Sequence, residues 1–260
     1  MNAPTTLIES CSERLWQAEQ RREPTALLSE TVPSLDEADA YAIQAATLRR
    51  RAAPVVGFKL GYTSAAMRAQ MGIAQPNYGV LTEQHRLAVG GAAIDSAKLI
   101  HPRVEPEIAL SLGRELSGSG HDRASVSRHL DAVFPALEVV DTRYPAYRFQ
   151  LVDNIADNSS SAGFVLGEPL AWDDGLDLAT LPVALVLDGT LVGEGRGADA
   201  MGDPLLALAW LAGFLAQQGR TVPAGSIVLT GGLTRAPEAR AGSCFEARFG
   251  ELGQVQARFA

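Results

Sequence analysis

From residue 55 to the C-terminus, hydrophobic and polar residues alternate in short segments that end at Gly or Pro. Alternation with a period of two is typical of strands that are buried on one face. Asp188-Gly189 interrupts one such segment, and this dipeptide is a strong signal for a hairpin turn. The pattern predicts strands or hairpins at 55–64, 99–113, 135–141, 161–167, 181–195, 224–232 and 244–259.

The first fifty residues show a helical spacing instead. Ile8, Cys11 and Leu15 recur on one face of a predicted amphipathic helix. A second helix is predicted at 34–51, with Ser34 and Glu37 in capping-box spacing. Three arginines at its end complement the negative end of the helix dipole.

Two further helices are predicted within the β-rich part of the chain. The first, at 64–72, is short and ends at Gly72. In the second, Asp203 is the expected cap, Pro204 occupies the first helical position and Gly219 ends the helix.

The order of these elements predicts a helical N-terminal region at 1–54 and a β-rich domain at 55–260, which together form one continuous unit. Alternating βαβ units are absent from the pattern, which excludes a Rossmann fold and a TIM barrel. We therefore predict an α+β protein with a mixed, mostly β main body.

Composition narrows the class of partner. The chain has 260 residues, of which 47% are hydrophobic and 20% charged, as in soluble globular proteins. A net charge of -8 argues against nucleic acid as the main partner. The most apolar stretch, 205–216, is too short to span a bilayer, and the first residues lack a signal-peptide pattern. Two distant cysteines favour a reduced, cytoplasmic protein, and the lack of a predicted membrane segment argues against a membrane partner.

Two glutamates stand out in an otherwise apolar predicted strand. Strand alternation puts Glu105 and Glu107 on one face, with Arg103 beside them. Neighbouring carboxylates repel unless one is protonated, both are solvated, or a cation lies between them. Two interpretations are open: an exposed edge strand marked by Pro106, or a pair of oxygen ligands for a divalent cation.

A third carboxylate changes the balance between these interpretations. Glu138 lies in an apolar run, and a Glu in such a setting is rarely buried without a partner. Three carboxylates from two strands, without His or Cys at ligand spacing, suit Mg²⁺ or Mn²⁺ better than Zn²⁺. The sequence thus favours a cation site formed by Glu105, Glu107 and Glu138.

Lys59 is the candidate positive charge. A period of two puts Gly57, Lys59 and Gly61 on one face of the strand, and Phe58 and Tyr62 on the other. The glycines leave space for a ligand around the lysine. Such a lysine can balance carboxylates, bind an anionic substrate or relay a proton. The other interpretation is an ordinary surface lysine.

Polar residues also gather before the strand predicted at 161–167, in "VDNIADNSSS". They form either a capped loop or a polar active-site loop. The glycines of "TGGLT" (230–234) form either a plain turn or a place where backbone N–H groups approach an anion. Arg143 either holds a substrate carboxylate or covers the surface.

Six segments, taken in order, resemble the 2-keto-4-pentenoate hydratase and 4-oxalocrotonate decarboxylase family, which belongs to the fumarylacetoacetate hydrolase superfamily. They are "GFKLGYTS", "QPNYG", "HPRVEPEIAL", "PALEVVD", "DNIADNSSSAGFVLG" and "AGSIVLTGGLT". The resemblance runs from about Val55 to the C-terminus, and the helical N-terminal region also fits.

The resemblance implies a distorted mixed β-roll, or distorted barrel, that follows an N-terminal helical region. It implies Mg²⁺ or Mn²⁺ held by Glu105, Glu107 and Glu138, with Lys59 as the pocket lysine. It also implies substrate contacts in the polar loop, and we expect a further contact from the nearby arginine: Asp157, Asn158, Ser160, Ser161 and Arg143.

The family contains two lyases of aromatic meta-cleavage pathways. One converts 2-oxo-3-hexenedioate (4-oxalocrotonate) to 2-hydroxypenta-2,4-dienoate and CO₂ through a metal-stabilised dienolate. The other hydrates that dienoate to 4-hydroxy-2-oxopentanoate. Family hydratases tend to carry an acidic residue where this chain has Asn77, and an amide is neither a general acid nor a general base. We therefore predict the decarboxylase, with Lys59 and Asn77 as catalytic positions, and keep the hydratase as the alternative.

Two other functions rank lower. An acylpyruvate-type C–C hydrolase needs a His–acid pair, and no histidine has such a sequence context: His85, His101, His121 and His129. A non-catalytic, metal-stabilised scaffold is the remaining alternative. The resemblance also implies a small-molecule 2-oxo acid as substrate, a homo-oligomer, and a complex of the decarboxylase with its paired hydratase.

Overall fold

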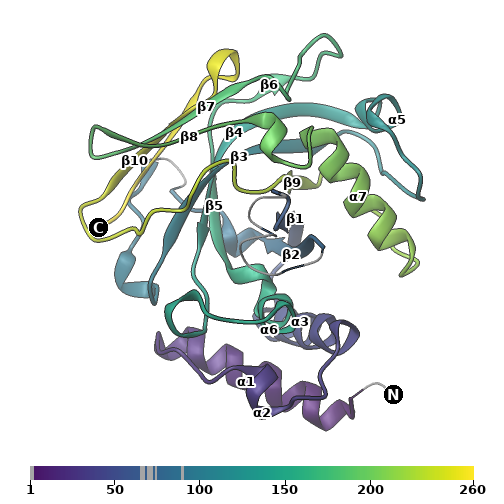
Figure 1. Ribbon diagram of the computed structural model, residues 1–260, viewed down its shortest axis with the longest axis vertical. Helices are drawn as coiled ribbons and strands as arrows, with labels where there is room; N and C mark the ends of the chain where they lie inside the picture. The colour runs from purple at the N-terminus through teal and green to yellow at the C-terminus, as the bar shows by residue number, and fades with distance from the viewer. Residues whose placement is uncertain (1–2, 65–67, 69–72, 74, 89–90) are drawn as a thin grey trace.

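In the computed structural model, which describes residues 3–64, 68, 73, 75–88 and 91–260, three helices precede the first strand. Ile8, Cys11 and Leu15 are buried, as their spacing predicted. The helices occupy one end of the molecule (Figure 1) and are α1 (Thr5–Arg21), α2 (Leu28–Thr31) and α3 (Glu37–Arg51).

Ion pairs join the end of α3 to α1. Arg50 lies 2.9 Å from Glu9, and Arg51 lies 2.7 Å from Glu19. The predicted arginine cluster therefore lies in the last turn of α3, where it also contacts a neighbouring helix.

The start of α3 differs from the prediction. Asp36, not Ser34, is the N-cap, and its side chain accepts a hydrogen bond from the Asp39 backbone N–H at 2.9 Å. The Asp39 side chain completes the capping box. The Ser34–Glu37 pairing is wrong because the helix begins at Glu37, so the cap must be the residue directly before it.

The main sheet contains seven strands within the described residues, in the order β2-β1-β9-β3-β4-β5, with β6 paired to β4. All the pairings are antiparallel except the one between β1 and β9. The sheet curls into a half-barrel (Figure 1), and its strands are β1 (Val55–Gly61), β2 (Asn77–Thr82), β3 (Arg103–Leu112), β4 (Leu130–Val140), β5 (Ser161–Leu166), β6 (Leu170–Ala171) and β9 (Ile227–Leu229).

A second, four-stranded sheet of described residues lies at the opposite end from the N-terminal helices (Figure 1), in the order β11-β10-β7-β8. The predicted hairpin turn is confirmed: Asp188 and Gly189 both have positive φ, 50° and 81°. The strands are β7 (Pro182–Leu187), β8 (Thr190–Arg196), β10 (Cys244–Arg248) and β11 (Gln254–Arg258).

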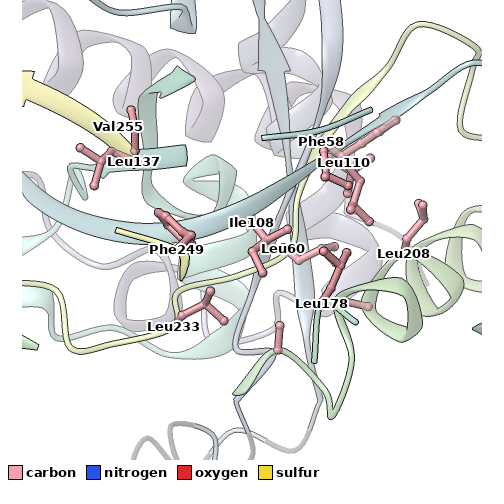
Figure 2. Close-up of a cluster of buried hydrophobic side chains, with 14 of the residues drawn as sticks. Phe58, Leu60, Ile108, Leu110, Leu137, Leu178, Leu208, Leu233, Phe249 and Val255 are labelled. Atoms are coloured by element: carbon pink, nitrogen blue, oxygen red, sulfur yellow. The ribbon is translucent and has the colours of Figure 1, made fainter. Parts of the chain in front are cut away.

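The main core lies between the two sheets and α7 (Pro204–Ala216). Figure 2 shows Phe58 of β1, Ile108 and Leu110 of β3 and Leu208 of α7 in this cluster. Alternate residues of β3 therefore face the core, as predicted, and leave the intervening residues for the opposite face.

One segment of the described chain, Gly197–Ala216, is long and apolar enough to cross a membrane by length and composition alone. Its α-helical part is α7, which is capped by Asp203 and has Pro204 in its first turn, as predicted. Leu205, Leu208, Leu211 and Leu215 of this helix are buried in the main core, which is the position of a core helix.

The N-terminal helices share a second hydrophobic cluster with Tyr144 and with Ile155 of α6 (Leu151–Ala156). Gln44 of α3 strengthens this contact because its amide donates to the carbonyl oxygens of Tyr78 and Ile155, at 3.0 and 3.1 Å. The helical region thus supports the segment that follows α6. The division at residue 54 stays a prediction.

The remaining described elements are short. The helix predicted at 64–72 lies largely outside the described residues. The others are α5 (Arg123–Ser127) and the 3₁₀ turns η1 (Glu83–His85), η3 (Ser96–Lys98), η4 (Pro145–Tyr147), η5 (Asn158–Ser160), η6 (Gly197–Asp199) and η7 (Gly250–Leu252).

The capping of α3 is testable by substitution. We expect Asp36→Ala to lower the free energy of unfolding by about 1 kcal/mol, because the Asp39 N–H loses its acceptor. Ser34→Ala is the matched control, and we expect it to change stability by less than about 0.5 kcal/mol. Urea unfolding measures both, and equal effects would contradict the assigned cap.

Candidate metal-binding site

The three predicted metal-binding carboxylates lie together on the face of the main sheet opposite the core. Glu105 of β3 is the direct cross-strand partner of Glu138 of β4, and Glu107 follows two residues along β3. One oxygen atom from each carboxylate lies within 4.8 Å of the others. The strand pairing alone thus brings together residues that are more than thirty positions apart.

The edge-strand interpretation is wrong. Strand β3 lies between β4 and β9, and the side chains of Glu107 and Glu138 are fully buried. Pro106 is tolerated inside the sheet because β9 pairs only with the Ala109–Ser111 part of β3. At Pro106 the carbonyl oxygen instead accepts a hydrogen bond from the Leu233 N–H at 3.0 Å.

Burial makes this cluster electrostatically unfavourable. It raises the pKa of Glu138 to about 7 and that of Glu107 well above its usual range. The pKa of Glu105 is also raised by burial, against the opposing effects of Lys59 and Arg103. Three acids held this close resist simultaneous ionisation unless positive charge is present.

Lys59 supplies one such charge, so the surface-lysine interpretation is wrong. Its side chain is 3% exposed, and Nζ lies 3.1 Å from Glu138 Oε2. Burial alone would lower the pKa of Lys59, but Glu138, Glu105 and Glu107 outweigh it and raise the pKa. Three carboxylates against one ammonium leave two negative charges, which a divalent cation would neutralise.

The oxygen atoms themselves fit a hard cation. Oε1 of Glu107 and Oε1 of Glu138 are buried and have no hydrogen-bond partner in the described part of the chain. Buried polar atoms in that state are rare and call for an explanation. A donor set of carboxylate oxygens alone suits Mg²⁺ or Mn²⁺.

The "TGG" turn after β9 explains the remaining oxygen of Glu107. The Gly231 N–H donates to Glu107 Oε2 at 2.6 Å. Glycine is required there because φ is 108° and a Cβ atom would lie 1.9 Å from Thr63 Oγ1. One backbone N–H does approach an anion here, and that anion is a side chain of the protein itself.

A cavity of about 480 Å³ lies beside Glu105 and Lys59. Tyr62 lines it, although alternation placed this residue on the core face with Phe58. The reason is a left-handed backbone at Tyr62, with φ of 58°, which breaks the strand periodicity directly after β1. Polar or charged side chains make up much of the remaining wall: Thr63, Ser64, Arg103, Tyr147, Asn154, Ser159, Ser160, Thr234 and Arg235.

The polar loop after α6 approaches the site in a strained conformation. Asn158, Ser159 and Ser160 have successive φ values of 53°, 52° and 58°. Such left-handed residues each cost energy and persist where surrounding contacts hold them. One of these contacts joins the loop to the carboxylate cluster: Lys59 Nζ donates to the Ser159 carbonyl oxygen at 3.0 Å.

Asn77 lies one layer behind this loop and does not line the cavity. Its side-chain amide donates to Asn154 Oδ1 at 2.7 Å, and its Oδ1 accepts from Ser159 Oγ at 3.0 Å. Asn154 in turn donates to Ser160 Oγ at 3.0 Å. Asn77 is thus a buried neutral link that orients the loop next to Lys59.

Of the five predicted substrate-binding residues, the structure brings only Ser160 to the cavity. Arg143 is buried away from it, where its guanidinium pairs with Asp157 and donates to the Asp141 carbonyl oxygen at 2.7 Å. The Asn158 amide bonds to the Val80 backbone. Ser161 is also buried outside the cavity wall.

No histidine of the described chain lines the cavity. His85 is buried, where Nδ1 accepts from the Thr82 N–H at 3.0 Å, and burial lowers its pKa to about 3. A ring nitrogen of His101 bonds to the Thr142 carbonyl oxygen at 2.9 Å. The site therefore lacks the His–acid pair that a C–C hydrolase would need.

Several cavity residues escaped prediction. Asn154 lies on α6, where "VDNIAD" read as a loop, and Arg235 follows the "TGGLT" turn without any local pattern. The left-handed backbone at Tyr62 and Tyr147 brings both into the wall, and no sequence pattern announces it.

Comparison with known proteins identifies the family. The model described as fumarylacetoacetate (FAA) hydrolase C-terminal matches residues 54–260. This chain belongs to that family. The relationship predicted from the six ordered segments is therefore confirmed, and so is the predicted α+β class with a curled, mostly β main body.

Two enzymes with different names are similar to nearly the whole chain. A 4-oxalocrotonate decarboxylase from Pseudomonas putida is 38% identical over 255 residues, which cover 97% of this chain and 96% of that protein. A 2-keto-4-pentenoate hydratase from Paraburkholderia xenovorans (strain LB400) is 35% identical over 255 residues, covering 96% and 94%. Both names are those of lyases.

A solved structure of the decarboxylase is also similar. The 4-oxalocrotonate decarboxylase from Pseudomonas putida G7, complexed with magnesium and adipate, superposes with a TM-score of 0.93 at 34% identity. The match covers 100% of both chains.

Metal binding by the carboxylates is testable without any substrate. We expect Glu107→Gln and Glu138→Gln each to weaken Mn²⁺ binding at least about 10-fold, because a ligand charge is lost. The metal-free variants should unfold at the wild-type temperature or above it, because mutual repulsion falls. Calorimetric titration and thermal unfolding measure these effects.

Glu251→Gln, which alters an exposed glutamate, is the matched control. A loss of stability in both variants with unchanged Mn²⁺ affinity would contradict the site.

Proposed function

We propose that this chain is a Mg²⁺- or Mn²⁺-dependent decarboxylase that converts 2-oxo-3-hexenedioate to 2-hydroxypenta-2,4-dienoate and CO₂. One observation carries the proposal: three carboxylates, two of them fully buried, and Lys59 meet beside one cavity, in a chain similar over its full length to 4-oxalocrotonate decarboxylase. The structural relative is complexed with magnesium, which agrees with the oxygen-only donor set of this site.

Glu105, Glu107 and Glu138 would hold the cation. When bound, it supplies positive charge to the 1-carboxylate and the 2-oxo oxygen of the substrate. The Gly231 N–H fixes one oxygen of Glu107, so this carboxylate is already oriented before any ligand arrives. Preorganised ligands of this kind lower the cost of binding.

Lys59 has the second role. Burial alone would lower the pKa of Lys59, but without a bound cation the neighbouring carboxylates raise it, so its ammonium group carries a positive charge beside the site. In the reaction the bond between C5 and C6 breaks, and its electron pair moves through the C3–C4 double bond to the 2-oxo oxygen. In this proposal Lys59 stabilises the negative charge on that oxygen and delivers the proton that gives the enol.

The hydratase is the second candidate because the hydratase relatives are nearly as similar as the decarboxylases. Hydration needs a group that manages the proton of the attacking water. The Asn77 amide is neither a general acid nor a general base, and both ends of it are engaged by Asn154 and Ser159. A neutral side chain at position 77 therefore favours decarboxylation over hydration.

The predicted substrate class, location and assembly are consistent with this reaction. The substrate class is a small 2-oxo acid, and a cytoplasmic location suits that chemistry. A homo-oligomer and a complex with the paired hydratase remain predictions. The C–C hydrolase and the non-catalytic scaffold rank lower, since no histidine in the described chain lines the cavity and Lys59 is aimed at the carboxylates.

A product assay tests the reaction. With Mg²⁺ or Mn²⁺ present, we expect CO₂ release from 2-oxo-3-hexenedioate and little hydration of 2-hydroxypenta-2,4-dienoate. A chelator should abolish CO₂ release. Hydration of the dienoate without CO₂ release would replace the decarboxylase with the hydratase, and neither reaction would favour the scaffold.

Lys59→Met tests the catalytic lysine in the same assay. Because the substitution keeps much of the side-chain volume and removes the charge and proton, we expect kcat to fall about 10²- to 10⁴-fold. Mn²⁺ affinity should be retained. A wild-type kcat would remove Lys59 from the mechanism, and a parallel loss of metal would make its role purely electrostatic.

A further inference from the structure

We propose that Arg143 is a positioning residue for Lys59, on which it acts through the strained loop Asn158–Ser160. The inference rests on the proposed function, because that function gives Lys59 its catalytic role. The Arg143 side chain is 6% exposed and lies outside the cavity wall. Any effect of Arg143 on the reaction must therefore pass through the residues that it holds.

The Arg143 guanidinium holds the loop from both ends. Before the loop it pairs with the Asp157 carboxylate and donates to the Asp157 carbonyl oxygen. After the loop it donates to the Ser161 carbonyl oxygen at 3.3 Å. A further bond, of 2.7 Å, joins it to the carbonyl oxygen of Asp141, directly after β4. A guanidinium offers its N–H donors in a rigid plane, so one side chain fixes these acceptors relative to one another.

The loop needs this support because its three residues have successive left-handed backbones. Non-glycine residues in that conformation cost energy and persist only where contacts enforce it. The Asn158 amide bonds to the Val80 backbone, and the Asp141 N–H donates to the Ser160 carbonyl oxygen at 2.8 Å. Since Arg143 also bonds to Asp141, its loss would weaken the hold on both the start and the end of the loop.

Ser159, at the centre of the loop, transmits this position to Lys59. Lys59 Nζ donates to the Ser159 carbonyl oxygen at 3.0 Å and lies 3.1 Å from Glu138 Oε2. The stem of a lysine is flexible and its ammonium group rotates, so the acceptors determine where the group points. A shift of the Ser159 carbonyl would therefore turn the ammonium group within the cavity. A misplacement of about 1 Å can lower a rate about 100-fold.

Arg123 provides a comparison within the same chain. Its Nε lies 3.1 Å from Asp203 Oδ2, and its guanidinium donates to the Leu176 carbonyl oxygen at 3.1 Å. This pair has similar chemistry, but it joins the start of α5 to the cap of α7, and neither residue lines the cavity. Removal of Arg123 thus breaks an arginine–aspartate pair without touching the loop.

Steady-state assays of CO₂ release with Mg²⁺ present separate positioning from stability. Arg143→Gln leaves the buried Asp157 carboxylate unpaired, so we expect a lower unfolding temperature. The double variant Arg143→Gln/Asp157→Asn removes that unpaired charge and should recover much of the unfolding temperature. Its kcat should nevertheless stay about 10- to 100-fold below the wild-type value, because the bonds that span the loop are still missing. KM and Mn²⁺ affinity should change less than about 3-fold, because Arg143 does not line the cavity.

Two further variants complete the series. Arg143→Lys keeps the charge but cannot span the same acceptors, so we expect an intermediate kcat, and this variant decides the question if the neutral variants do not fold. Arg123→Gln should keep the wild-type kcat.

Hydrogen exchange reports on the loop without turnover. The Asp141 N–H donates to Ser160, and the Ser160 N–H donates to the Asp157 carbonyl oxygen at 3.0 Å. We expect these two amides to exchange at least about 10-fold faster in the double variant, and at the wild-type rate in Arg123→Gln.

Three results would overturn the assignment: a wild-type kcat in the double variant or in Arg143→Lys, a loss of Mn²⁺ affinity that parallels the loss of kcat, or unchanged exchange of the two amides. Failure of the proposed reaction is distinct. A wild-type protein that releases no CO₂, but whose double variant shows faster loop exchange, loses the decarboxylase and keeps the hold of Arg143 on the loop.

CO₂ release by the wild-type protein with a wild-type kcat in Arg143→Lys does the reverse.

Discussion

Mutual repulsion among three neighbouring carboxylates, two of them fully buried, is the constraint on which the rest of the site depends. Glu105, Glu107 and Glu138 are held together by strand pairing, so they cannot separate to relieve it. Lys59 offsets one charge, and protons or a divalent cation must offset the rest. Such a cluster is unfavourable when all three carboxylates are ionised and no metal is bound. Binding of a metal relieves the repulsion and thereby stabilises the folded protein.

The scaffold determines this arrangement through register. Because β3 faces the core with one set of residues and the site with the other, a slip of one residue against β4 would bury the carboxylates in an apolar cluster. The core on the opposite face therefore stabilises the site indirectly. Hydrogen bonds donated by Lys59 and Asn154, and one that Asn77 accepts from Ser159, then hold the strained Asn158–Ser160 loop against it.

Two arginines illustrate how tertiary structure separates similar sequence signals. Arg143 and Arg103 both lie near predicted acidic site residues. Arg143 forms an ion pair with Asp157 and donates a hydrogen bond to the Asp157 carbonyl oxygen, so it supports the loop that carries Ser159. The second forms no ion pair with the described residues; its guanidinium lies over the Tyr147 ring, and the residue lines the cavity. Their different roles depend on which carboxylates the fold leaves within reach, and that cannot be read from spacing along the chain.

The sequence by itself determined most of the elements and the choice of candidate metal ligands. Alternation located β1, β3 and β4, and the improbability of a lone buried carboxylate singled out Glu138. Local turn chemistry located the Asp188–Gly189 hairpin and the cap of α7. These features depend on near neighbours along the chain, so a linear pattern contains them.

Only the tertiary structure decided which side chains share one cavity. Tyr62 and Tyr147 enter its wall through left-handed backbone conformations that interrupt any periodic pattern. Lys59 became a buried partner of Glu138 because β1 and β4 belong to one curled sheet. Pairings between distant segments set these contacts, and their geometry, unlike the strand periodicity, is not encoded in any local stretch of residues.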